Sequence, residues 1–88
     1  MIYKDDFIKF LNDYFKGKRV DVKHFPSGCS MIDIYITEKD LICVQVEPSQ
    51  IGISKIEDYP NYFDLSTISD NVFYSNADAE NFILRMNI

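Results

Sequence analysis

The chain has 88 residues and a formal net charge of −5, with 47% hydrophobic and 26% charged residues. These values are typical of one small globular domain, which we place at residues 1–88, and they exclude a disordered or fibrous chain. The sequence contains neither a secretory leader pattern nor an apolar run long enough to cross a bilayer. We therefore expect a cytoplasmic protein.

The net charge is confined to the C-terminal half of the chain. Up to Val44, acidic and basic residues are equal in number, whereas from Gln45 onward only Lys55 and Arg85 are basic. The acids of that half are Glu47, Glu57, Asp58, Asp64, Asp70, Asp78 and Glu80. Such a surface repels nucleic acids and anionic membranes, so we expect direct binding to neither. The partner that this charge favours is a basic protein.

Residues 3–15 have the spacing of an amphipathic helix. Apolar side chains recur there at steps of three and four residues, and charged side chains fall on the opposite face. The apolar positions are Tyr3, Phe7, Phe10, Leu11, Tyr14 and Phe15. Gly17 is suited to end the helix in a left-handed conformation. The wide aromatic stripe predicts a helix that lies across a sheet.

The period then changes to two, which is typical of strands. Alternation over residues 19–24, 31–36 and 41–47 predicts three strands, and residues 51–53 predict a shorter fourth. The intervening turns are Pro26-Ser27-Gly28, Glu38-Lys39-Asp40 and Pro48-Ser49. Antiparallel pairing of consecutive strands places their Val and Ile residues on one common face.

The alternation also predicts which residues face each other. In the first hairpin, Val20 is expected opposite Ile34. In the second, Ile34 is expected opposite Val44, and in the third, Val46 opposite Ile51. Because a slip of one residue would turn each apolar row to water, the agreement between these rows favours a meander of neighbouring strands.

The last part of the chain contains a long connector, a short strand and a helix. Residues 57–70 have no periodicity, residues 72–74 form a brief apolar run, and Ser75 to Asp78 match a helix start. The helix would bury Ala79, Phe82, Ile83 and Met86. We therefore predict an α+β fold: an antiparallel meander sheet of three to five strands, with the N- and C-terminal helices packed on one face.

One pair of carboxylates on the opposite sheet face could hold a cation. The first hairpin sets Asp21 directly across from Asp33, and two opposed carboxylates can bind a hard metal ion or share a proton. The interpretation we favour is an exposed ionic mesh, in which Arg19 and Lys23 neutralise both acids. The sequence thus predicts no metal site, although a small enzyme or metal-binding protein built on Asp21 and Asp33 remains an alternative.

Catalytic and cofactor-binding motifs are absent from the sequence. His24 and Cys29 flank the first turn, but their positions in the alternation direct them to different faces of the sheet. Cys29 and Cys43 are too far apart in the predicted sheet to form a disulfide, so reduced thiols are expected. The glycines are scattered rather than gathered in a phosphate-binding loop. We expect neither enzymatic activity nor a cofactor.

The connector is the candidate contact surface. Its acids and tyrosines combine rigid contact area with charge that attracts a basic partner. The candidate partner-binding residues are Glu57, Asp58, Tyr59, Tyr62, Asp64 and Asp70. Phe63 and Leu65 are instead expected to close over the edge of the core. For the two tyrosines, a core lid and a contact patch are both open.

The sequence as a whole therefore predicts a small acidic binding module that recognises or inhibits a basic protein such as a toxin, nuclease or nucleic-acid-binding effector. We expect this module, of immunity or inhibitor type, to be bacterial or phage in origin from the style of its sequence. A self-associating structural protein is the alternative from another class. It would form a homodimer through a sheet edge or through the open sheet face, which presents Met31, Tyr35, Leu41 and Cys43.

Overall fold

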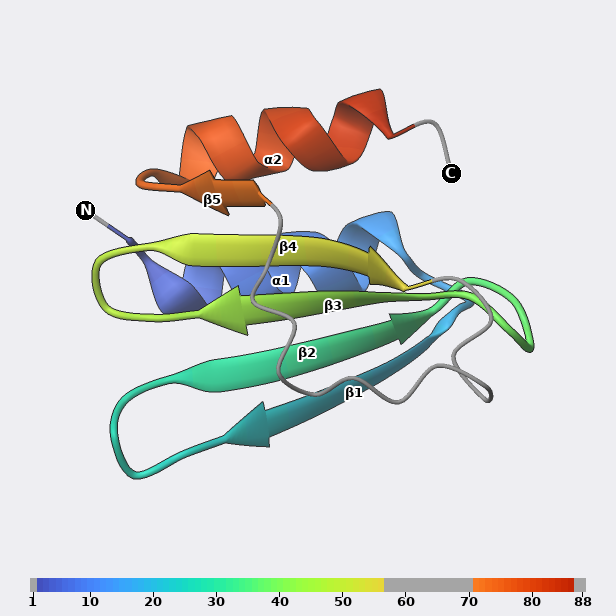
Figure 1. Ribbon diagram of the computed structural model, residues 1–88, viewed down its shortest axis with the longest axis horizontal. Coiled ribbons are helices and arrows are strands. Elements are labelled where there is room, and N and C mark those ends of the chain that lie inside the picture. Colours follow the sequence, from blue (N-terminus) through green and yellow to red (C-terminus); the bar gives the residue numbers. More distant parts are fainter. Residues whose placement is uncertain (1, 57–70, 87–88) are drawn as a thin grey trace.

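The computed structural model describes residues 2–56 and 71–86. Its elements, in chain order, are α1 (Lys4–Tyr14), β1 (Arg19–His24), β2 (Ser30–Tyr35), β3 (Leu41–Val46), β4 (Ile51–Ile56), β5 (Asn71–Phe73) and α2 (Asn76–Arg85). The strands form one antiparallel sheet in the order β1-β2-β3-β4-β5, with a helix from each end of the chain packed against it (Figure 1). The predicted α+β meander and its element order are confirmed.

The core lies between the helices and one face of the sheet. Figure 1 shows α1 passing behind the middle strands and α2 running alongside β5. The buried residues from the helices and from the C-cap of α1 are Phe7, Leu11, Phe15, Ala79 and Ile83. Those from the sheet are Ile32, Ile34, Ile42, Val44, Val46, Ile51 and Ile53. The predicted Val/Ile face is thus the face that both helices cover, and its burial is the main source of stability.

Local sequence features mark the start and end of α2 and the turn after α1. In α2, the Ser75 side chain caps the N-terminus by accepting a hydrogen bond from the Asp78 backbone N–H at 3.2 Å. Arg85 lies in its last turn, where a positive charge favours the helix dipole. After α1, Gly17 has a φ of 94°, a conformation that few other residues adopt readily. This glycine lets the chain turn toward β1.

One asparagine side chain joins the start of α1 to the start of α2. The Tyr3 backbone N–H donates to Asn76 Oδ1 at 3.0 Å, and Asn76 Nδ2 donates to the Tyr3 carbonyl at 2.9 Å. Asn76 is the first residue of α2, and Tyr3 is the N-cap of α1. Because both polar groups of the amide are used, this contact fixes the start of one helix against the start of the other.

The first and third hairpins have the predicted register. Val20 lies opposite Ile34 in the β1–β2 pair. Val46 lies opposite Ile51 in the β3–β4 pair. The Pro48-Ser49 turn between the latter strands closes with a hydrogen bond from the Glu47 N–H to the Gln50 carbonyl at 2.8 Å.

The predicted register of the second hairpin is wrong by two residues. Ile34 lies opposite Ile42, not opposite Val44, and Ile32 takes Val44 as its partner. The turn is the physical cause. The Thr37 hydroxyl accepts hydrogen bonds from the backbone N–H groups two and three residues later, at 3.1 and 3.0 Å, and so closes the turn early. A slip of two residues keeps each side chain on its predicted face.

Strand β1 is less covered than the alternation predicts. Val22 and His24 face the core side of the sheet, yet Val22 is 38% exposed and His24 is also exposed. The reason is position: β1 is the edge strand farthest from β5 and α2, beyond the region that the helices cover (Figure 1). Both faces of β1 are therefore open to solvent over most of its length.

Candidate binding site beside the C-terminal helix

The contact residues predicted from the sequence lie outside the described part of the chain. Glu57, Asp58, Tyr59, Tyr62, Asp64 and Asp70 all belong to the segment between β4 and β5. Phe63 and Leu65 belong to the same segment. Their assignment as contact residues or as core closers remains a prediction. The strand that follows this segment, β5, and helix α2 are described, and together they form a hollow on the molecular surface.

The floor of the hollow is an aromatic pair. Phe73 at the end of β5 and Phe82 in the middle of α2 place their ring centroids 5.0 Å apart, with an angle of 42° between the ring planes. Both rings are half-buried, so one side of the pair packs on the core and the other side faces the hollow. The hollow has a volume of about 320 Å³. An aromatic pair open on one side is a ready contact surface for another molecule.

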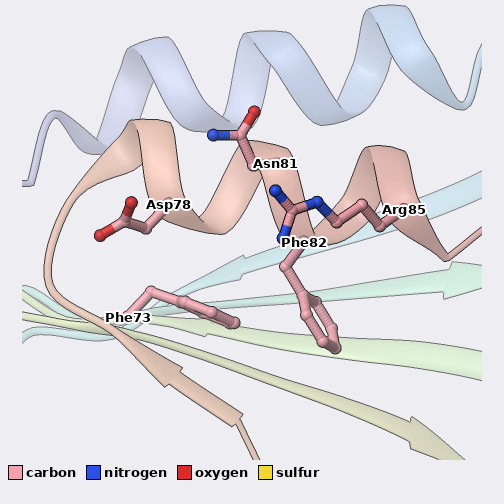
Figure 2. Close-up of a pocket in the computed structure, with 5 residues that line it drawn as sticks. All are labelled: Phe73, Asp78, Asn81, Phe82 and Arg85. Carbon is pink, nitrogen blue, oxygen red and sulfur yellow. The ribbon is translucent and has the colours of Figure 1, made fainter.

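Three polar side chains of α2 surround this floor. Asp78, Asn81 and Arg85 line the hollow with the two rings, and all three are exposed. Figure 2 shows Asp78 projecting from the first turn of α2, while Arg85 reaches back along the helix toward Phe82. Asp78 and Arg85 are seven residues apart, which is two helical turns, or about 10 Å along the axis. The rim therefore carries a negative end and a positive end.

The two neighbours of Phe73 in the chain are also exposed. Tyr74, which joins β5 to α2, is 67% exposed, and Val72 on β5 is 38% exposed. Tyrosine is enriched at protein interfaces because it offers a rigid ring together with a hydroxyl. Val72 lies opposite Gly52 and alternates with Phe73, so its side chain lies on the other face of β5 from Phe73. We call the depression lined by Phe73, Asp78, Asn81, Phe82 and Arg85 the α2–β5 hollow.

The predicted carboxylate pair is present on the outer face of the sheet. Asp21 lies opposite Asp33, and the next residue in this row is Cys43, which lies opposite Asp33 on β3. Arg19 neutralises the outer carboxylate, since its Nη2 lies 3.0 Å from Asp21 Oδ2. No group of three or more His, Cys, Asp or Glu side chains suited to a metal gathers within residues 2–56 and 71–86.

Cys43 has an altered acidity because of its burial and its neighbour Asp33. Burial, and then the facing Asp33 carboxylate, which repels the thiolate and accepts a hydrogen bond from the thiol, raise the pKa of Cys43 to about 12. Such a thiol stays protonated at neutral pH and is a poor nucleophile. The predicted register placed Cys43 opposite position 35, so the contact between Cys43 and Asp33 was not expected.

His24 has a partner that the sequence reasoning missed. His24 Nδ1 lies 2.6 Å from Ser30 Oγ, and these residues face each other across the first hairpin. The register that pairs Val22 with Ile32 also places His24 opposite Ser30, so the signal was present in the sequence. Ser30 is only 2% exposed, whereas a nucleophilic serine must present its hydroxyl to a substrate. The contact ties the end of β1 to β2.

Comparison of this chain with protein-family models, curated protein sequences and solved structures finds no match. Across the described ranges, no helix has the length and apolar character needed to cross a membrane. What the fold and the hollow define is a small α+β domain with an aromatic surface site of mixed charge.

Proposed function

We propose that this chain is a small non-catalytic protein-binding module, cytosolic and of bacterial or phage origin, that recognises or inhibits a more basic protein. The observation that carries the proposal is the α2–β5 hollow, in which the Phe73–Phe82 ring pair is surrounded by a carboxylate, an amide and a guanidinium. An apolar centre with a polar rim is the usual anatomy of a protein interface.

The negative end of the hollow suits a basic side chain of the partner. A lysine or arginine that lies over the exposed side of Phe73 and Phe82 is attracted by the aromatic faces. Asp78, in the first turn of α2, supplies a carboxylate for a charge-assisted hydrogen bond to the same group. The excess of acids in the C-terminal half favours the approach of a basic protein over long range.

The positive end of the hollow restricts the orientation of the partner. Arg85 repels a second basic side chain and binds a carboxylate or a backbone carbonyl. The two ends are about 10 Å apart along the helix, which equals the rise of three residues of an extended chain. The hollow therefore suits an extended segment in which a basic residue and an acceptor group lie about three positions apart.

The predicted acidic connector remains part of this proposal. Glu57, Asp58 and Asp64 precede β5 in the chain, and their charges add to the attraction for a basic partner. Their effect is expected mainly on the rate of association and on its dependence on salt. Asp78 is expected to affect the lifetime of the complex, because its contact forms within the interface.

Affinity capture with matched charge variants tests the proposal. We expect the wild-type chain to retain a basic protein from a lysate of its native cell in one-to-one proportion. Asp78→Lys should lose this protein, whereas Asp13→Lys, which makes the same change in charge on the exposed side of α1, should retain it. The triple variant Glu57→Lys, Asp58→Lys and Asp64→Lys should show reduced yield. Equal yields of one basic partner from all four proteins would disprove the proposal.

A further inference from the structure

The free edge of β1 offers a second interaction surface. β1 has six residues, whereas the opposite edge strand β5 has three. Soluble proteins usually interrupt or cover a long edge strand, because its unpaired backbone groups can bind another strand. Between Arg19 and His24 the chain has no proline, glycine or bulge, and every residue is paired with β2 in continuous register. Among residues 2–56 and 71–86, β1 pairs with β2 alone, and no described strand lies along its other edge.

The hydrogen bonds of the first hairpin determine which backbone groups face this edge. Phe25 N–H donates to the Cys29 carbonyl at 2.9 Å, which makes these two residues a hydrogen-bonded pair. Hydrogen-bonded and non-bonded pairs alternate along an antiparallel ladder. Counting back from Phe25, every second residue of β1 is therefore hydrogen-bonded to β2. The peptide groups of Val20, Val22 and His24 point away from the sheet, toward the free edge.

We propose that two copies of this chain associate through β1, antiparallel, with Val22 on the two-fold axis. In this arrangement Val22 pairs with Val22 of the partner subunit, and Val20 pairs with His24 of the partner subunit. Each pairing joins residues whose peptide groups face outward, as the ladder requires. On the outer face of the joined sheet, Asp21 lies opposite Lys23 of the partner subunit, and the symmetry forms this contact twice.

Charge selects this register over its neighbours. A shift of the partner strand by two residues in one direction opposes Asp21 to Asp21 and Arg19 to Lys23. The same shift in the other direction opposes Lys23 to Lys23. Like charges directly opposite each other destabilise a sheet, whereas opposite charges stabilise it. Wider shifts shorten the paired segment, so one register satisfies both the backbone and the charges.

The dimer leaves the proposed binding site free. β1 and β5 form opposite edges of the sheet, so the α2–β5 hollows of the two subunits lie at the two far ends of the joined sheet. A dimer of this form would carry two copies of the partner, which raises the affinity for any target that displays two binding segments. The dimer does not depend on the hollow and can be tested without any partner.

Sedimentation equilibrium of the purified chain tests the dimer. We expect reversible association to a dimer, weakened about tenfold or more by either Asp21→Lys or Lys23→Asp, because each change opposes like charges twice. The double variant Asp21→Lys/Lys23→Asp exchanges the two charges and should restore the wild-type dissociation constant to within about threefold. Thermal melting of each variant accounts for loss of the contact between Arg19 and Asp21.

A backbone variant tests the edge itself. Val22→Pro removes an N–H that points to the free edge, so the monomer should remain folded while the dimer is lost. Circular dichroism and melting check that the variant is folded. A wild-type chain that stays monomeric up to about 1 mM would overturn the proposal. A dimer unaffected by Val22→Pro would do the same, and failure of the charge exchange to restore the dimer would overturn the register.

Discussion

The Cys43 thiol should resist alkylation at mildly alkaline pH. Its pKa is about 12, compared with the ordinary value of 9.0. At pH 8 an ordinary thiol is about one-tenth thiolate, whereas Cys43 would be about one ten-thousandth thiolate. Because only the thiolate reacts with iodoacetamide, and a thiolate of higher pKa is a stronger nucleophile, Cys43 should react more slowly than an unperturbed cysteine by roughly 30- to 100-fold.

Peptide mapping by mass spectrometry over a time course measures this rate, with denatured protein as the unperturbed reference. Asp33→Asn removes the facing negative charge and should speed the reaction of Cys43. Asp21→Asn removes the same charge one strand further away and should change the rate little. Rapid labelling of Cys43 in the folded wild-type protein, or an identical rate in Asp33→Asn, would refute the reasoning.

Four further outcomes follow from the structure. The folded pKa of Cys43 lies above its unfolded value, so its stabilising effect is present below about pH 9 and is lost as the pH rises toward 12. Urea denaturation should therefore show that the free energy of unfolding of the wild type falls over this range relative to that of Cys43→Ala. Asn76→Ala removes two hydrogen bonds and should cost about 1–2 kcal/mol by the same assay, whereas Asn12→Ala, on the exposed side of α1, should cost about 0.5 kcal/mol or less. Ile83→Ala leaves a cavity in the core and should lower the free energy of unfolding by about 2–4 kcal/mol. Leu84 is 51% exposed, so Leu84→Ala should lower it by less than about 1 kcal/mol. Gly28→Ala places a side chain at a φ of 90° and should lower stability by about 1–2 kcal/mol in thermal melts.

The strand pairing shows how far hydrophobic alternation predicts a sheet. Alternation determines which face each side chain takes, and that part of the prediction is confirmed in the core. It does not distinguish registers that differ by two residues, because such a slip leaves every face unchanged. The second hairpin differs from the prediction in this way. The register of this hairpin depends on Thr37, whose hydroxyl closes the turn.

The candidate site was predictable only in part. The helical spacing of α2 predicted that Phe82 would face the core, and Phe82 is packed against it on one side. The contact of Phe82 with Phe73 depends on how β5 lies beside the helix, and a three-residue strand has too little pattern to determine that placement. The exposure of β1 likewise depends on its position at the edge of the sheet, beyond the helices, and alternation does not report this.

The most direct test of the proposed function is calorimetric titration of the captured basic partner with the wild-type chain, Asp78→Lys and Asp13→Lys. If the partner binds the α2–β5 hollow, Asp78→Lys should weaken binding by about tenfold or more, while Asp13→Lys should change it by about twofold or less. Equal dissociation constants for the wild type and Asp78→Lys would contradict a binding site at this hollow.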